Sequence, residues 1–471
     1  MAPLNNVNNV NNISRVKNTS GYDAIVIGAG FAGLSAAVRL ASRGARVLVL
    51  EARSRLGGRA TAFPDRETGE LVDNGQHVLL GCYTDTFAFL REIGALAHVR
   101  LQPELAVTMI DPSGVRSRLV CPLLPPPLHL LAGVLEWDAL SWRDKWSALG
   151  MASPLRLARR ELEPGSTTIA ASPDETVESW LVRHGQTRRL RQMLWEPLAL
   201  AALNQPPDRA AAPVFARVLA EMFASDPRAA AIGLPTRPLH LMYAEPARAY
   251  IETHGGSVRA GASATIRHAN DTVRSVTAGS DEWVAPAIVA AVPWFAFARL
   301  FDAVPAPLAE IVRRARAMAS SPIVTVNVWF DRPVIDEPFV GLPGRAMQWV
   351  FDKRTAFGDG ASHLSLVSSG ATSLGALTNE DLIARAQEEL LEALPSVRQA
   401  RLTRATVVRE PHATFSLAPG QPARPGTETP LGGLFLAGDW IDTGLPATIE
   451  SAVRSGHRAA EAALGARAPI S

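Results

Sequence analysis

The sequence is short of several residue types, and each scarcity excludes a class of protein or site. Only two of its 471 residues are cysteine, Cys82 and Cys121. Two thiols this far apart provide no disulfide framework and match no metal-ligand spacing, so both are expected to be buried thiols in a reducing compartment. Lysine occurs only at positions 17, 145 and 353, and the net charge is +2. Without a basic block, nothing indicates a nucleic-acid partner.

Long hydrophobic runs are also scarce. Residues 119–135 carry no formal charge but contain Pro122, Pro125, Pro126 and Pro127, a density that breaks a membrane-spanning helix. Three interpretations of this stretch stay open: the wall of an apolar tunnel, peripheral contact with the inner membrane face, or ordinary core. Residues 1–20 repeat Asn-Asn-Val and lack the apolar core of an export signal. They predict a disordered leader and a cytoplasmic protein.

The clearest pattern in the chain is a strand, a glycine turn and a helix. Residues 24–28 form a short apolar strand, Gly28, Gly30 and Gly33 make GxGxxG, and residues 31–43 have a helical pattern. A second strand follows and ends at Glu51, 18 residues after Gly33. This arrangement predicts a dinucleotide site, with the pyrophosphate at the helix N-terminus and Glu51 on the adenosine ribose. The predicted contacts also include Ala29, Phe31, Ala32, Ala52 and Arg53.

A second glycine pair follows directly. Gly57, Gly58 and Arg59 indicate another close approach of backbone to phosphate, with a guanidinium to neutralise its charge. A simple nicotinamide dehydrogenase has no use for this addition. The segments GAGFAGLSAA, LEARSRLGGR and LAGDW together resemble the FAD-dependent amine oxidase and phytoene desaturase superfamily.

The resemblance implies a non-covalently bound FAD and further cofactor contacts. Gly438 and Asp439 match the pair that contacts ribityl or phosphate, and Ala264 falls where the family usually has a valine against adenine. Pro446 stands near a helix start, so nearby N–H groups can point at the flavin. Those residues are Ala447, Thr448 and Ile449.

The length favours two interleaved domains, because 471 residues exceed a single ordinary core. The strand, glycine turn and helix, with the resemblance, imply an α/β fold. A Rossmann-like FAD-binding domain is expected to alternate with a mixed-sheet and helical substrate domain. A helical, apolar segment from residue 142 to about 250 suits a long hydrocarbon substrate. The predicted FAD-binding segments are 21–98, 251–300 and 410–471, and the predicted substrate segments are 99–250 (helical cap) and 301–409 (sheet).

The run DNGQHVLLGCYTDTFAFLREIGA resembles one branch of the superfamily, the hydroxysqualene dehydroxylases of hopanoid biosynthesis. Asn74, Gly75, Gln76 and His77 offer hydrogen-bond partners at a turn, useful beside a flavin. The resemblance implies hydride transfer from reduced FAD to an allylic carbon of a long apolar isoprenoid as its hydroxyl departs. An external electron donor of unknown identity must then reduce the flavin again. His77 is the candidate proton donor, with flavin packing as its alternative role.

Three other functions compete with dehydroxylation. Amine oxidation is disfavoured because Thr325 aligns where that subgroup commonly has a lysine, and four tyrosines hardly supply an aromatic cage for an amine. Carotenoid-type desaturation or isomerisation shares the apolar substrate and stays open. A flavin-binding protein without catalysis is the third, and it does not explain why a complete FAD frame is joined to a large apolar domain.

Overall fold

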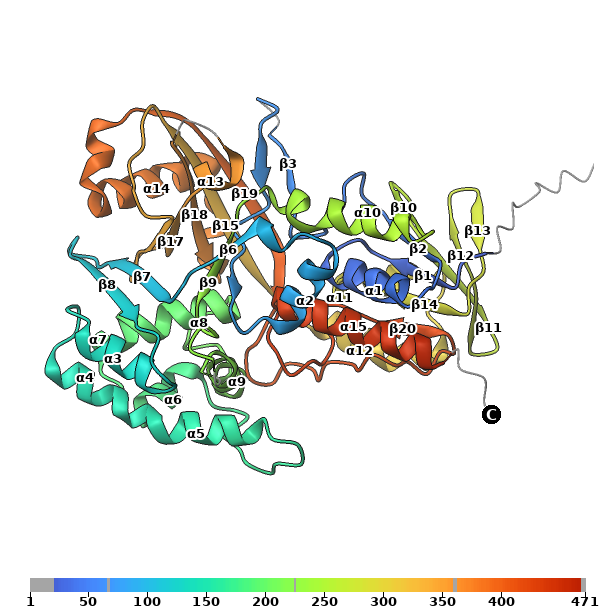
Figure 1. Ribbon diagram of the computed structural model, residues 1–471, viewed down its shortest axis with the longest axis horizontal. Helices are drawn as coiled ribbons and strands as arrows, with labels where there is room; N and C mark the ends of the chain where they lie inside the picture. The colour runs from blue at the N-terminus through green and yellow to red at the C-terminus, as the bar shows by residue number, and fades with distance from the viewer. Residues whose placement is uncertain (1–20, 66–67, 224–225, 359–361, 467–471) are drawn as a thin grey trace, which may run out of the picture.

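The computed structural model describes residues 21–65, 68–223, 226–358 and 362–466. The leader predicted over residues 1–20 lies outside them. Figure 1 shows an elongated molecule with a parallel sheet and its helices at one end, and a mixed sheet with a helical cap at the other. The predicted α/β class, with a parallel nucleotide-type sheet and a separate mixed sheet, is confirmed.

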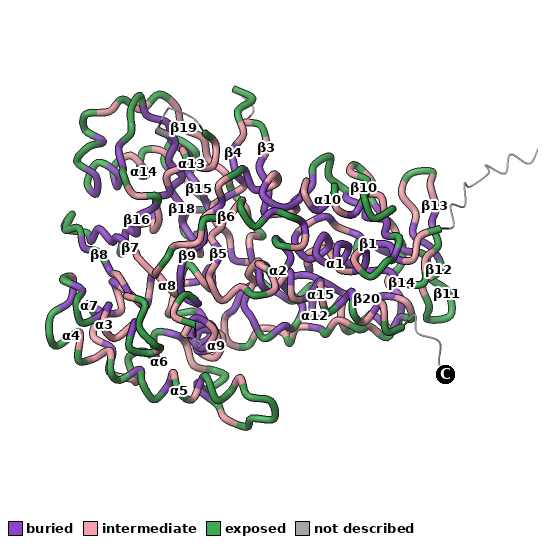
Figure 2. Tube along the Cα trace, in the orientation of Figure 1, coloured by how far each residue is buried: buried purple, intermediate pink, exposed green. Residues whose placement is uncertain are grey.

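The parallel sheet has five strands in the order β10-β2-β1-β14-β20. One face is covered by α1 (Phe31–Ser42), α10 (Glu245–Thr253), α15 (Ile449–Gly465) and α2 (Thr84–Glu92), and the other by α11, α12 and the small sheet β11-β12-β13. With both faces covered, the central strands are continuously apolar and buried, as Figure 2 shows. Its strands are β1 (Ala24–Ile27), β2 (Val47–Glu51), β10 (Ser257–Ala260), β14 (Ala287–Ala290) and β20 (Leu434–Leu436).

The mixed sheet has seven strands in the order β19-β15-β18-β17-β16-β7-β8. Side chains alternate across it: Val350, Leu364 and Leu366 pack with α14 (Asn379–Ala393), whereas Trp349 and Phe351 face the opposite side. The strands are β7 (Leu105–Ile110), β8 (Arg116–Cys121), β15 (Ser320–Phe330), β16 (Phe339–Gly341), β17 (Trp349–Asp352), β18 (Ser362–Ser369) and β19 (Leu402–Phe415).

A helical cap lies below the mixed sheet in Figure 1. It holds most of the residues for which a helical pattern is predicted, but β9 (Ile232–Pro235) interrupts it and pairs with β5 (Leu79–Leu80) and β6 (Val99–Leu101). The cap helices are α3 (Leu128–Glu136), α4 (Trp142–Ala148), α5 (Ala152–Glu161), α6 (Val177–Arg183), α7 (Arg188–Leu190), α8 (Glu196–Leu203) and α9 (Ala212–Met222). The remaining strands and α-helices are β3 (Ala62–Pro64), β4 (Leu71–Asp73), β11 (Thr265–Ala269), β12 (Thr272–Ala278), β13 (Asp281–Trp283), α11 (Trp294–Phe297), α12 (Ala309–Ala317) and α13 (Arg354–Phe357).

Three details differ from the sequence prediction. Residues 255–268 do not form a strand pair, because β10 joins the parallel sheet and β11 pairs with β12. Alternation shows that both stretches are strands but does not show which partner each one takes. The boundary predicted at 409/410 falls inside β19, a single strand paired with β15. Cys121 is buried as expected, whereas Cys82 is only partly buried.

Candidate active site

One cavity of about 1190 Å³ extends from the glycine turn of the parallel sheet to the mixed sheet and the cap. It brings together segments that the chain keeps hundreds of residues apart. Of the predicted cofactor contacts, only Ala29 and Gly33 are absent from its wall. The predicted residues that line it are Gly28, Gly30, Phe31, Ala32, Glu51, Ala52, Arg53, Gly57, Gly58, Arg59, Asn74, Gly75, Gln76, His77, Ala264, Gly438, Asp439, Ala447, Thr448 and Ile449.

The glycines of the turn are required by close backbone packing. A Cβ on Gly33 would lie 1.9 Å from the carbonyl oxygen of Gly28, and one on Gly28 would lie 2.4 Å from that of Ala291. Gly33 therefore lets α1 pack on β1 and does not itself face the cavity. Gly30 and Gly58 face each other, since a Cβ on Gly58 would lie 3.2 Å from the Cα of Gly30. The two turns form a cradle without side chains.

Glu51 ends β2 at the rim of this cradle. Its carboxylate accepts the N–H of Ala29 at 2.8 Å and the N–H of Arg53 at 2.9 Å. Ala29, absent from the cavity wall, thus acts by orienting Glu51. Each oxygen keeps a further lone pair, so the side chain can still accept hydrogen bonds from a ligand's hydroxyls.

Arg59 and Asp439, both predicted phosphate-side contacts, form an ion pair. The guanidinium nitrogen Nη2 lies 2.6 Å from Oδ1 of Asp439, and Nη1 donates to the carbonyl of Ala413 at 2.8 Å. Burial alone disfavours the charged guanidinium, but Asp439, with smaller contributions from Glu410 and Tyr243, outweighs this and raises the pKa of Arg59. The pair joins the first and last segments of the nucleotide-binding half.

The turn at residues 73–77 is held by a lysine that the sequence interpretation did not place in the site. The Nζ of Lys353 lies 2.7 Å from Oδ2 of Asp73 and donates to Oε1 of Gln76 at 2.7 Å. Lys353 and Asp73 are both buried. Lys353 is one of three lysines in a chain whose other cations are arginines. The rarity of lysine is the one feature of the sequence that could have pointed to Lys353 as a site residue.

His77 faces the cavity beside this pair. Its Nδ1 makes no hydrogen bond within the described structure. Burial lowers the pKa of His77, the nearby carboxylate of Asp73 opposes this, and Lys353 adds to the lowering. The imidazole is therefore neutral near pH 7, and it can offer one N–H to a ligand.

The other half of the cavity is apolar. One face of the mixed sheet supplies its floor, and the cap supplies its roof, with a mixture of aromatic, methionine and aliphatic side chains. The sheet residues include Val107, Met109, Leu119, Cys121, Phe339, Trp349, Phe351 and Val367, and the cap residues include Leu130, Leu131, Val134, Met151, Leu155, Leu194, Trp195 and Leu198. The apolar cap agrees with the pattern of residues 142–250, whereas no local pattern marks the sheet residues as part of a site.

Thr325 lies beneath the turn and not in the cavity. It is 1% exposed, and its Oγ1 would lie 3.6 Å from a Cβ on Gly75. Thr325 therefore offers no charged group to the cavity. Burial of Thr325 under Gly75 supports the turn that carries Gln76 and His77.

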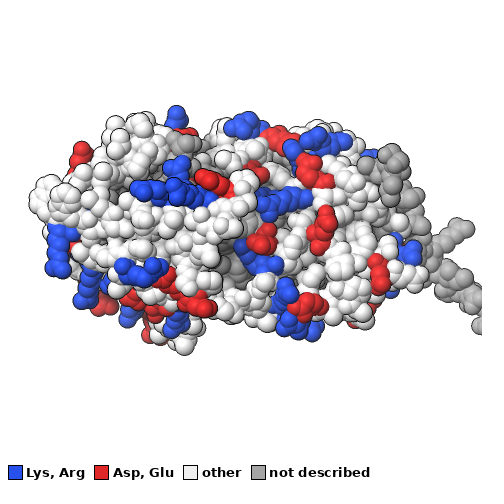
Figure 3. Space-filling view, turned by 90° about the horizontal axis from the view of Figure 1, so that it is seen from below, with Lys and Arg blue, Asp and Glu red and all other residues white. Residues whose placement is uncertain are grey.

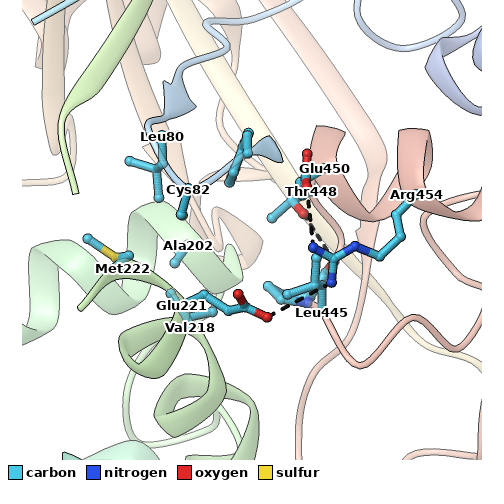
Figure 4. Close-up of a pocket in the computed structure, with 12 residues that line it drawn as sticks. Leu80, Cys82, Ala202, Val218, Glu221, Met222, Leu445, Thr448, Glu450 and Arg454 are labelled. Carbon is cyan, nitrogen blue, oxygen red and sulfur yellow. Dashed lines mark hydrogen bonds and ion pairs between the residues drawn. The ribbon is translucent and has the colours of Figure 1, made fainter. Parts of the chain in front are cut away.

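A smaller pocket opens where α15 meets α9, next to the main cavity (Figure 4). The guanidinium of Arg454 reaches between Glu450, at 3.3 Å, and Glu221, at 3.9 Å. Burial raises the pKa of Glu450. Burial of Cys82, with the charges of Glu221 and Glu450 nearby, raises the pKa of its thiol to about 12. The thiol there is protonated and unreactive. This ion-pair group holds the cap against α15.

Within residues 21–65, 68–223, 226–358 and 362–466, no group of histidine, cysteine, aspartate and glutamate side chains is arranged to hold a metal ion. No helix among these residues is both long enough and apolar enough to cross a bilayer.

Comparison with known proteins identifies the family. The model of the flavin containing amine oxidoreductases matches residues 31–464. The chain belongs to this family. It is 33% identical to the hydroxysqualene dehydroxylase of Rhodopseudomonas palustris (strain ATCC BAA-98 / CGA009), over 94% of this chain and 98% of that protein. It is 25% identical to a 15-cis-phytoene desaturase of an Oncidium hybrid cultivar, over 93% of this chain and 77% of that protein.

Solved structures of the family share the fold. Cyclohexylamine oxidase from Brevibacterium oxydans IH-35A superposes with a TM-score of 0.68 at 18% identity, covering 94% of this chain and 99% of that one. At this identity the likeness concerns the fold alone. The chain is thus a flavin-dependent oxidoreductase with the two-sheet architecture of its family.

The residues present fit the FAD that the family uses. Gly30, the N-cap of α1, provides no side-chain cap, so the first N–H groups of the helix are left for phosphate. The Gly30–Gly58 cradle gives a pyrophosphate close access to the backbone, and Glu51 stands where a ribose follows. The start of α15, at Ala447 and Thr448, lines the same cavity and directs its positive end inward.

Proposed function

We propose that this enzyme reductively removes the hydroxyl group of hydroxysqualene to give squalene, a step of hopanoid and triterpene biosynthesis. The observation that carries the proposal is the single cavity in which the FAD cradle opens directly into a long apolar chamber. Such a chamber suits a C30 hydrocarbon, whereas a small polar substrate would leave its apolar walls in contact with water.

The relatives support the choice of reaction. Of the two relatives, the hydroxysqualene dehydroxylase is the more similar: it is 33% identical, and the match covers 98% of its length. The phytoene desaturase is 25% identical and is matched over 77% of its length. A desaturase or isomerase acting on a carotenoid-type chain is the alternative, because the apolar cavity would accept that substrate too.

Amine oxidation has less support from the site. Thr325 is buried and uncharged, and the nearby Lys353 is held by Asp73 and Gln76. Tyr83 is the one tyrosine among the residues that line the described cavity, and the rings of Trp349 and Phe351 lie among aliphatic side chains of the sheet face.

The reaction breaks one C–O bond and forms one C–H bond. Reduced FAD, when bound, supplies the hydride for the allylic carbon. The departing hydroxide needs a proton, so that water is the second product, and an external two-electron donor must restore the reduced cofactor. The donor's identity is open, since the nucleotide fingerprint at residues 28–33 is used by FAD.

The protein's own groups have three tasks in this reaction. The apolar walls bind the hydrocarbon and exclude water from any cationic character at the reacting carbon. The Lys353–Asp73 pair fixes the turn through Gln76. His77, neutral and facing the cavity, stabilises the leaving oxygen with a hydrogen bond from its N–H, while the proton that completes the product water comes from solvent.

A pair of reactions tests the proposal. Anaerobically reduced enzyme is mixed with hydroxysqualene, and flavin reoxidation is followed together with squalene formation by gas chromatography. Oxidised enzyme is mixed separately with squalene or phytoene and a quinone acceptor. We expect turnover only in the first mixture. Desaturation in the second mixture, with hydroxysqualene unchanged in the first, would overturn the dehydroxylase proposal in favour of a desaturase.

A further inference from the structure

The cavity reaches the protein surface at the cap, some distance in sequence from the FAD cradle. Five of its lining residues there are themselves exposed, which marks an opening that we name the cap mouth: Pro127, Leu149, Ala152, Arg156 and Arg159. They belong to the start of α3, to the α4–α5 junction and to α5. A hydrocarbon that enters at the cap mouth reaches the apolar half of the cavity first.

Large apolar side chains are exposed next to the cap mouth. Trp142 and Trp146 are 68% and 67% exposed, and Leu149 is 44% exposed while also lining the cavity. These three residues stand at positions i, i+4 and i+7, so they follow one side of the helical segment to the cap mouth. Together with four leucines around α3 they form what we name the cap surface: Leu123, Leu124, Leu128, Leu135, Trp142, Trp146 and Leu149.

Contacts within the cap tie these residues into one surface. The Nζ of Lys145 donates to the carbonyl of Leu135 at 2.7 Å and lies 5.2 Å from the ring centre of Trp142. This links the end of α3 to α4. Leu128 and Leu135 are exposed on α3, whereas Leu130, Leu131 and Val134 of the same helix line the cavity. The helix thus separates an apolar interior from an apolar exterior.

We propose that the cap surface docks on a lipid bilayer, so that the cap mouth opens onto the membrane and the substrate enters without crossing water. Tryptophan is enriched at membrane interfaces, and an apolar surface rimmed by cations is typical of proteins that lie in the interface plane. The exposed cations of α4 and α5 are Arg143, Arg156, Arg159 and Arg160, against the exposed acids Glu161 on α5 and Glu136 and Asp138 at the end of α3. Figure 3 shows basic and acidic side chains among broad uncharged areas on the cap half of one face.

The bilayer explains the position of this surface better than a second copy of the chain does. A partner subunit seated there would cover Leu149 and obstruct the cap mouth, whereas lipid is itself the phase in which a long isoprenoid dissolves. The described helices are too short or too polar to span the membrane, so contact at one face is the form that remains. The substrate part of this argument rests on the proposed function, but the docking itself does not.

The test measures binding to vesicles without any turnover. The holoenzyme is sedimented with phosphatidylcholine vesicles, with and without phosphatidylglycerol, and compared with a Trp142→Ser/Trp146→Ser variant. We expect the wild-type enzyme to co-sediment, and to do so more strongly with the anionic lipid. The partition coefficient of the variant should be lower by a factor of about ten or more. The matched control is Val284→Ser/Leu391→Ser, which removes two exposed apolar side chains beside β13 and on α14 and should leave binding unchanged.

Two further measurements make the result decisive. FAD content and turnover of detergent-dispersed substrate should be equal in the tryptophan variant and the wild type, because neither tryptophan lines the cavity. Absence of wild-type co-sedimentation, or equal binding by the tryptophan variant, would overturn the proposal. So would a dimer in sedimentation velocity that the tryptophan substitutions dissociate, since the cap surface would then contact a second copy. Failure of the dehydroxylation assay with vesicle binding intact would reject only the proposed reaction.

Discussion

At the scale of single residues, the site depends on polar groups that are held by buried partners. Lys353 and Asp73 form an ion pair with both side chains buried, and the amide of Gln76 joins it. Removing one member of such a pair leaves an uncompensated buried charge. The turn that carries Gln76 and His77 is therefore fixed by contacts made well below the cavity surface.

Glu51→Gln should weaken FAD binding about tenfold or more. The amide keeps the shape of the side chain but loses charge-assisted hydrogen bonds worth about 1.5–3 kcal/mol. Ala29 and Arg53 each donate a backbone N–H to a different oxygen of Glu51. The NH₂ group of a glutamine would therefore face one of these N–H groups, donor against donor. Fluorescence titration of FAD into apoprotein measures the change. Glu252→Gln, an exposed change on α10, is the control, and equal affinities would place the ribose elsewhere.

His77→Ala should abolish most turnover while FAD stays bound. The imidazole lines the cavity and its buried Nδ1 has no hydrogen-bond partner in the described structure, so its loss removes a polar group from the cavity wall. We expect a fall of about 100-fold or more in the single-turnover rate. The flavin spectrum and FAD content serve as the control for binding. An unchanged rate would leave His77 with a packing role only.

His363 should make the protein less stable as the pH falls below about 6.5. Burial, with added repulsion from Lys353 and Arg404, lowers its pKa from 6.5 to about 3. Between these values the unfolded chain binds a proton that the folded chain does not. Stability is therefore present above pH 6.5 and is lost on acidification, by at most about 1.4 kcal/mol per pH unit for this one proton.

Urea unfolding from pH 7 to pH 5 measures this slope. The variant His363→Phe should flatten it while keeping an aromatic ring against Trp329, on which His363 stacks at 4.2 Å. His254→Phe is the matched control, because His254 also stacks on an aromatic ring, at 4.1 Å from Tyr250, but is exposed. A slope that His363→Phe does not change would contradict the prediction.

At the scale of elements, the contact between α1 and α15 fixes the cofactor half of the site. Both helices begin at the cavity wall, and they pack side by side on the parallel sheet (Figure 1). The close approach is made at Gly456, where a Cβ would lie 2.2 Å from the Oγ of Ser35 and 2.3 Å from the carbonyl oxygen of Ala32. The backbone of α1 cannot move away from Gly456 without displacing the glycine turn at its N-terminus.

Gly456→Ala should therefore destabilise the protein by about 1–3 kcal/mol and weaken FAD binding. Gly465→Ala on the same helix is the matched control. A Cβ on Gly465 meets nothing within 4 Å, so that change should be neutral or slightly stabilising. Thermal unfolding of both variants, with FAD titration, measures the difference. Equal stabilities would mean that α15 can move away from α1 at little cost.

At the scale of the whole molecule, one cavity joins the two halves, so the cofactor and the substrate meet between them. Cys121 and His77 both line this cavity, so each is a residue that could in principle form a covalent bond to the flavin. We nevertheless predict that FAD is bound non-covalently. Cys121 lies on β8, in the apolar half. Burial and the charge of Glu104 raise the pKa of its thiol to about 12, so it is a poor nucleophile for the flavin.

Acid precipitation of the holoenzyme should consequently release all yellow colour into the supernatant. The released flavin should migrate as intact FAD in chromatography. Colour retained in the protein pellet would contradict non-covalent attachment. In that case the variants His77→Ala and Cys121→Ser would show which residue carries the link.

The sequence by itself determined those parts of the protein that depend on neighbours along the chain. The strand, glycine turn and helix of residues 24–42 follow from local apolar pattern and from steric needs of Gly28 and Gly33. The α/β class and the FAD cradle followed from that pattern and from the family motifs at both ends. Strand positions were predicted well, but the partners of β10 and β11 were not, because alternation carries no information about pairing.

Only the tertiary structure decided which distant residues meet. Lys353 and Asp73 are 280 positions apart, and Arg59 and Asp439 are 380 apart, so no local pattern predicts either ion pair. The same holds for the cavity wall, where one face of the mixed sheet meets the cap, and for the cap mouth beside Trp142 and Trp146. The physical reason is that side-chain charge, polarity and size are local properties, whereas burial and ion pairing arise only when packing brings separate segments together.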